Sequence, residues 1–137
     1  MARGSVTNVS RVNAKLDDLS RAARREVSQS VFKGAQRIAN RAAHLIKDGA
    51  VSGAGHVPSA PGQPPNADTH YLDRSIHVVK VEELAAEVRV TAGYAADLER
   101  GNSKMAARPF MAPAVRQEQD AAAVDFLEGL AKARGLR

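Results

Sequence analysis

A long amphipathic stretch near the start of the chain is the feature that most constrains its fold. Between residues 12 and 47, apolar side chains recur at steps of three and four residues, which places them on one stripe of a helix. The stripe consists of Val12, Leu16, Leu19, Ala23, Val27, Val31, Ala35, Ile38, Ala42 and Leu45. Ser10 is a candidate N-cap, and Lys47 followed by Gly49 is a C-terminal signal. The pattern predicts one long helix, or two helices end to end, over residues 12–47.

The length of this predicted helix bears on assembly. At about 1.5 Å per residue it would be on the order of 50 Å long. The chain has 137 residues, which is the size of one domain with one hydrophobic core. A helix of that length overhangs such a domain, so we expect part of its apolar stripe to contact another subunit. The opposite face is basic, and the simplest expectation is that it is solvated. Its residues are Arg21, Arg24, Arg25, Lys33, Arg37 and Arg41.

A loop rich in proline and glycine is expected over residues 49–69. Pro58, Pro61, Pro64 and Pro65 exclude a helix or an interior strand there. A connection of about 20 residues is long for a compact domain, and such loops are commonly functional or disordered. It could therefore be an inter-subunit arm or a flexible surface loop. As an arm it would supply possible inter-subunit contacts at Pro61, Pro64, Pro65 and Leu72.

The second half of the chain predicts a hairpin and two helices. Residues 76–81 and 86–91 are β-branched and alternate in polarity, so they are expected to pair as antiparallel strands. Residues 94–100 could form a short helix closed by Gly101, and residues 112–133 are helical in pattern, with Pro113 tolerated in the first turn. Five residues of the last helix could face the core: Val115, Ala122, Phe126, Leu127 and Leu130.

Together these elements predict one α+β domain over residues 1–137, with a flexible Pro/Gly-rich loop at 49–69. A long N-terminal helix and a C-terminal helix would pack on a small antiparallel sheet.

The sequence carries no recognisable catalytic pattern. It has no cysteine, which excludes disulfides and thiolate chemistry, and no P-loop, nucleophile elbow or dinucleotide fingerprint. Asp68, His70, Asp73 and His77 could in principle gather around a metal ion, but their spacing fits no recurrent site. No run approaches the roughly 20 apolar residues of a membrane span. We therefore predict no enzyme activity, no cofactor, no metal and no membrane partner.

The distribution of charge leaves one alternative open. The net charge is +5, and residues 1–50 hold ten Lys and Arg against four Asp and Glu. Such an excess can mean contact with nucleic acid, or a solvated helix face rich in arginine. A small basic DNA-binding protein is therefore the alternative function. Against this alternative, the sequence lacks helix–turn–helix spacing and an aromatic stacking platform.

Two elements in the second half resemble a known family signature. Residues 94–103 read Tyr-Ala-Ala-Asp-Leu-Glu-Arg-Gly-Asn-Ser, and residues 107–114 read Ala-Arg-Pro-Phe-Met-Ala-Pro-Ala. They resemble the gene-ten-like tail-component family of long-tailed phages, which includes lambda's minor tail protein Z. Residues 60–65 and 68–76 are similar to the family's Pro-rich stretch and to its Thr-Gly-x-Leu-x-x-Ser-Ile element, with His70 in place of the glycine that would give a tight turn. The resemblance covers about residues 15–130 in the same order.

The matched motif implies structural roles for its residues. They are Leu98, Glu99, Gly101, Arg108, Pro109, Phe110 and Pro113. Glu99 and Arg108 are close enough in sequence to form an ion pair across the turn at Gly101. Pro109 would hold the chain extended so that Phe110 fills a pocket or joins the ordinary core.

The resemblance implies a structural virion protein of a tailed phage, prophage or phage-like particle. It would lie at the head–tail junction. A tail completion or terminator protein is the first choice of role, and a head-side adaptor or stopper is the second. Together with the overhanging helix, the resemblance predicts a closed homo-oligomeric ring, a hexamer, that binds other neck and tail proteins. Double-stranded DNA would pass through the channel without sequence-specific binding. Localisation would be the virion, and the host bacterial cytoplasm during assembly.

Overall fold

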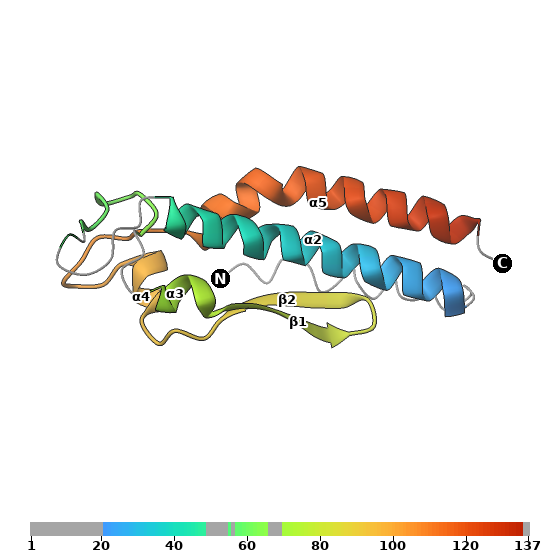
Figure 1. The fold of residues 1–137 in the computed structure, drawn as a ribbon, viewed down its shortest axis with the longest axis horizontal. Coiled ribbons are helices and arrows are strands. Elements are labelled where there is room, and N and C mark those ends of the chain that lie inside the picture. Colours follow the sequence, from blue (N-terminus) through green and yellow to red (C-terminus); the bar gives the residue numbers. More distant parts are fainter. Residues whose placement is uncertain (1–20, 49–54, 56, 66–69, 136–137) are drawn as a thin grey trace.

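The computed structural model describes residues 21–48, 55, 57–65 and 70–135. Its elements are α2 (Arg21–Lys47), α3 (Tyr71–Arg74), β1 (Ile76–Glu82), β2 (Ala85–Val90), α4 (Ala95–Arg100) and α5 (Met111–Arg134). The long elements form three layers, with α2 between α5 and the β1–β2 hairpin, and α3 and α4 lie together at one end (Figure 1). The predicted α+β class is confirmed. Residues 12–20 of the predicted helix, and residues 49–54, 56 and 66–69 of the predicted loop, lie outside the described residues.

Helix α2 is the central element because its apolar residues pack against other elements on two of its sides. Ala23, Val27, Ala42 and Ile46 have no exposed area. One cluster, around Ala42 and Ile46, joins α2 to α3, α4 and the start of α5. A second and smaller cluster, around Ala23 and Val27, joins the start of α2 to the end of α5. Since helix propensity alone holds a helix weakly, this packing on both sides is what stabilises α2.

The hairpin has the predicted antiparallel pairing. Ile76 lies opposite Val90 and Val78 opposite Val88, with a shift in register between Lys80 and Glu82. Strand alternation puts these valines and Ile76 on one face, and Ile76 and Val90 pack against the main core. The other face, with residues such as His77, Glu87 and Arg89, is exposed. Among the described elements, α2 thus covers one side of the sheet (Figure 1).

Small residues let α2 and α5 approach closely as an antiparallel pair. A Cβ atom built on Gly34 would lie 3.2 Å from the Cβ of Ala122, and one built on Gly129 would overlap the side chain of Ser30. Ser30 and Gly129 are both buried. This contact therefore depends on the absence of a side chain at residue 129.

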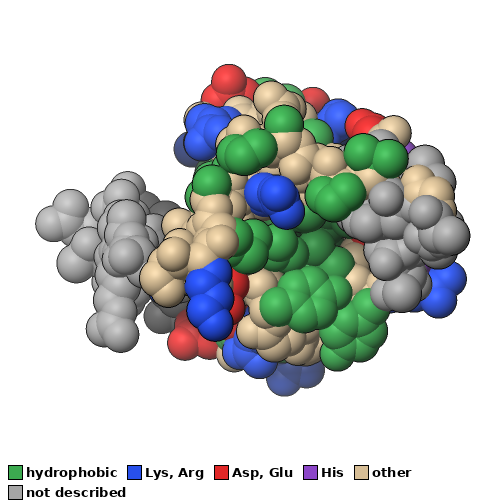
Figure 2. All heavy atoms as spheres, turned by 90° about the vertical axis from the view of Figure 1, so that its left-hand side faces the viewer, with side chains coloured by type: hydrophobic (Ala, Val, Ile, Leu, Met, Phe, Trp, Pro, Cys, Tyr) green, Lys and Arg blue, Asp and Glu red, His purple; other side chains and the backbone are tan. Residues whose placement is uncertain are grey.

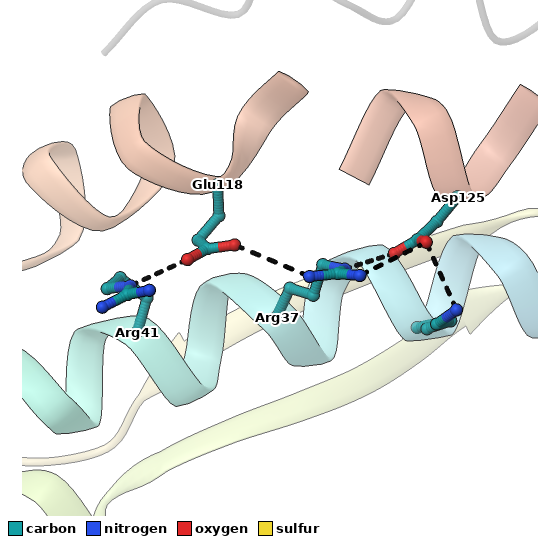
Figure 3. Close-up of polar contacts among 5 residues, drawn as sticks. Arg37, Arg41, Glu118 and Asp125 are labelled. Carbon is teal, nitrogen blue, oxygen red and sulfur yellow. Dashed lines mark hydrogen bonds and ion pairs between the residues drawn. The ribbon is translucent and has the colours of Figure 1, made fainter. Parts of the chain in front are cut away.

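Acidic residues of α5 meet basic residues of α2 along the same interface. Glu118 pairs with Arg41 at 2.8 Å and Arg37 at 3.9 Å, and Asp125 pairs with Arg37 and, at 3.2 Å, with Lys33 (Figure 3). Asp125 is buried, and its hydrogen bond from Arg37 is the main cause that lowers its pKa. The expectation that the basic face is simply solvated is therefore wrong for these positions.

The inward face of α5 differs from the predicted one. Ala122, Phe126 and Leu130 are half-buried, as expected. Val115 and Leu127 are instead 39% and 60% exposed. The buried positions of the helix are Ala114, Asp125, Gly129 and Ala133. The reason is that small residues and Asp125 occupy the side of α5 that faces α2, which leaves Val115 and Leu127 on the outside.

Candidate assembly interface

The residues of the family-like motif gather at one end of the molecule. Helices α3 and α4, the described part of the proline-rich segment and the start of α5 lie together there (Figure 1). Figure 2 looks onto this end, where hydrophobic side chains gather with Lys and Arg side chains among them. We refer to this surface, which carries Tyr71, Arg74, Tyr94 and Lys104, as the end face.

Glu99 joins α4 to α5 through backbone hydrogen bonds. Its Oε2 accepts hydrogen bonds from the N–H groups of Phe110 (2.8 Å) and Met111 (3.0 Å), and its Oε1 accepts one from Ala112 (2.8 Å). These amides belong to the first turn of α5, where N–H groups have no partner inside the helix. A carboxylate also interacts favourably with the positive end of the helix dipole. Glu99 is therefore the cap of α5, supplied from another helix.

The predicted ion pair between Glu99 and Arg108 is not the contact that forms. Both oxygens of Glu99 instead accept hydrogen bonds from backbone N–H groups at the start of α5. Arg108 instead contributes its backbone, whose N–H donates to the carbonyl of Leu98 at 2.6 Å. The Nε of Arg108 is buried and makes no hydrogen bond with any described residue.

Gly101 closes α4 in a conformation that favours glycine. Its φ is 74° and its ψ is 172°. A Cβ built there would lie 2.7 Å from the backbone nitrogen of Ala107 and 3.0 Å from the carbonyl oxygen of Met105. The backbone of the following turn thus occupies the space that any side chain would need.

The remaining motif residues form the core beneath the end face. Phe110 is 1% exposed in the main cluster, and Leu98 packs against it. Pro109 is half-buried, directly before Phe110. Pro113 is half-buried in the first turn of α5, where a missing N–H breaks no helical bond. The interpretation of Phe110 as a core residue fits this burial.

His70 adopts the backbone conformation that the family's glycine would give. Its φ is 61° and its ψ is 14°. Among the described residues, His70 is the one non-glycine residue with a left-handed backbone. Its Nδ1 lies 3.3 Å from the Oδ1 of buried Asp73, whose Oδ2 lies 3.7 Å from the Nζ of Lys47. The tight turn is therefore kept, although histidine replaces glycine. Asp68 lies outside the described residues, and within these residues no group of three His, Cys, Asp or Glu could hold a metal ion.

The proposed inter-subunit contacts differ in how accessible they are. Pro61 is exposed and Pro64 is half-buried, whereas Pro65 and Leu72 are buried in their own subunit. The N–H of Gly62 donates to the carbonyl of Ala107 at 2.9 Å, which attaches this segment to the loop before α5. The segment of residues 57–65 is thus part of the end face.

Two tyrosines of the end face were not singled out by the sequence reasoning. Tyr71 and Tyr94 are 56% and 45% exposed, and their ring centroids lie 6.1 Å apart at a tilt of 41°. Partial burial raises the pKa of Tyr94, and Tyr71 and Asp73 add to the effect. Both residues occur within the family-like motifs, and this position was the signal that could have identified them from the sequence. Exposed paired aromatic rings with hydroxyl groups are typical of binding surfaces.

Comparisons with known proteins identify one family. The family model described as "Bacteriophage HK97-gp10, putative tail-component" matches residues 10–101, about two thirds of the chain. This match covers α2, the hairpin, α4 and both tyrosines, and ends before α5. No curated protein matches the chain, and no solved structure matches it.

Proposed function

This chain belongs to the HK97 gp10-like family of phage tail components, and from this premise we propose that it is a structural virion protein forming a ring at the head–tail junction. Within the junction, a tail completion or terminator role is our first choice. A head-side adaptor or stopper is the second. Such a role requires binding to neighbouring proteins and no catalysis.

The observation that carries this proposal is the convergence of the family motifs on the end face. Glu99, Gly101 and Phe110 fix the loops there, while Tyr71 and Tyr94 stay exposed above them. Large apolar side chains that gather on a surface commonly mark a protein–protein contact. The motif therefore acts to shape a docking surface.

The partners that we propose follow from this role. The chain would form a homo-oligomeric ring, a hexamer, and would bind other neck and tail proteins in the virion after assembly in the host cytoplasm. Double-stranded DNA would pass through the ring without sequence-specific binding. No helix in the described part of the chain has the length and apolar character needed to cross a membrane.

The contacts of α2 favour this role over the alternative of a DNA-binding protein. Of the six basic residues on its predicted basic face, Arg24, Lys33, Arg37 and Arg41 pair with carboxylates of the same chain. Binding of phosphates would have to compete with these carboxylates. We therefore expect weak affinity for DNA that does not depend on sequence.

Deletion of the gene from the phage or prophage that encodes the chain tests the proposed role. We expect electron micrographs of lysates to show filled heads and tails that are not joined, or tails of uncontrolled length. The wild-type gene supplied in trans should restore complete particles. Complete, infectious particles without the protein would contradict the proposal.

A further inference from the structure

Helix α5 carries two of its larger aliphatic residues, Val124 and Leu127, on the side that faces away from the rest of the subunit. Val124 is 51% exposed and Leu127 is 60% exposed. Residues three and four apart lie side by side on a helix, so exposed Ala123 and Ala131 extend the same surface. We call Ala123, Val124, Leu127 and Ala131 the α5 stripe.

The charges that flank Val124 and Leu127 along the α5 stripe are acidic, whereas exposed Arg134 lies one turn after Ala131 at the C-terminal end of the stripe. Asp120 lies one turn before Val124, and Glu128 lies one turn after it. Both are exposed and neither lies in an ion pair with another described residue, although Asp125 and Glu128 are among the carboxylates that raise the pKa of Arg37 in the same subunit. The part of the stripe around Val124 and Leu127 is therefore an aliphatic patch with carboxylates on its border.

The end face has the complementary chemistry. Its exposed tyrosine rings stand beside Arg74, and Lys104 projects from the turn after α4. Neither basic side chain forms an ion pair among the described residues, and Asp97 is the acidic residue exposed on α4. Aromatic rings with basic neighbours suit an aliphatic patch bordered by carboxylates.

These two surfaces cannot meet within one subunit. The end face lies where α2 ends, whereas the α5 stripe lies beyond the middle of α5, which runs away from that end (Figure 1). A contact between them therefore needs a second copy of the chain. Because the two surfaces differ, the contact is head-to-tail, and repetition with a closing rotation makes a ring.

We propose that the end face of one subunit docks on the α5 stripe of the next, with Tyr71 and Tyr94 against Val124 and Leu127. This inference rests on the proposed ring and names the surfaces that form it. Arg74 of one copy would then lie near Asp120 of its neighbour.

Cysteine cross-linking tests the contact, because the chain has no cysteine of its own. Particles would be assembled with the double variant Tyr71→Cys/Leu127→Cys and treated with a mild oxidant. We expect a ladder of covalent multimers that ends at the ring number and collapses on reduction. The matched control is His77→Cys/Leu127→Cys, because His77 is exposed on the outer face of β1. Equal ladders in both variants, or no ladder in intact particles, would overturn the inference.

A charge-reversal pair decides the case if the cysteine variant does not assemble. Arg74→Glu should lower particle yield at least tenfold, and Arg74→Glu/Asp120→Arg should restore most of it. Circular dichroism of the purified chains checks that each variant folds. A double variant no better than Arg74→Glu would overturn the inference. A ring held by other surfaces would leave the proposed function standing, whereas absence of any ring would refute both.

Discussion

At the scale of single residues, Glu99 links the family motif to the stability of the fold. One side chain satisfies three N–H groups at the start of α5, and its charge lies at the positive end of the helix. The motif's glutamate is thus explained by capping.

Two substitutions of Glu99 should lower the stability of the fold by different amounts. We expect Glu99→Ala to lower the free energy of unfolding by about 1–2 kcal/mol, the usual cost of losing a helix cap. Glu99→Gln should cost less, because its amide oxygen can still accept while the charge is lost. Urea unfolding monitored by circular dichroism measures both. Exposed Glu82 supplies the control, and a loss in Glu82→Ala equal to that in Glu99→Ala would refute the capping account.

His70 offers a test of backbone conformation. A left-handed conformation costs a residue with a Cβ atom roughly 1–2 kcal/mol relative to glycine. His70→Gly and His70→Ala both remove the contact with Asp73, so their difference isolates the backbone. We expect the glycine variant to be more stable by about 1 kcal/mol in thermal or urea unfolding. Equal stability would show that residue 70 is not left-handed in solution.

At the scale of elements, the α2–α5 interface combines close packing with ion pairs. The contact of Gly129 with Ser30 brings the helices together. Glu118 and Asp125 of α5 form ion pairs with Lys33, Arg37 and Arg41 of α2 (Figure 3). Both features can be tested separately.

A methyl group at residue 129 should destabilise the helix pair. In Gly129→Ala the new Cβ would overlap the Ser30 side chain, and overpacking of this kind costs about 1–3 kcal/mol. Ser30→Gly in the same chain should relieve the overlap and recover part of the loss. Gly135→Ala is the control, because its Cβ would lie 3.4 Å from the nearest atom, the Lys132 carbonyl oxygen. Unfolding curves in which Gly129→Ala is at least as stable as wild type would contradict the close contact.

The pH dependence of stability should reflect Asp125. Its pKa is lowered in the folded protein, first by the hydrogen bond from Arg37 and also by Lys33. The unfolded chain therefore binds the proton more readily than the folded one. The stabilisation of the folded state by ionised Asp125 is fully present above the ordinary aspartate pKa of about 3.9, and it is lost as pH falls through the lowered pKa of the folded protein. Asp125→Asn should unfold with a shallower loss of stability below about pH 4. An unchanged acid profile in this variant would argue against the pair.

The sequence predicts elements better than it predicts their partners. Periodicity identified α2, the hairpin and α5, because local spacing determines which residues can share a face. It misassigned Arg37 and Arg41, since their partners Glu118 and Asp125 lie far away in sequence. For the same reason it placed Leu127 inside. It paired Glu99 with Arg108 because the charges of side chains do not show which backbone N–H groups lie within reach. Tyr71 and Tyr94 gained importance only when folding brought them together, since they lie 23 residues apart in the sequence.

At the scale of the whole molecule, the subunit is elongated and carries different surfaces at separate places. The family motifs shape the end face, and α5 presents an aliphatic stripe elsewhere on the subunit. A chain of this kind can join identical copies head to tail and still bind other proteins on its remaining surfaces. This arrangement is what a ring around a channel needs.

A reconstruction of the assembled particle tests the central claim most directly. We expect a closed sixfold ring of this chain around the tail axis at the head–tail junction, with DNA able to pass through its centre. A single copy per particle, or copies scattered over the capsid shell away from the tail axis, would contradict it.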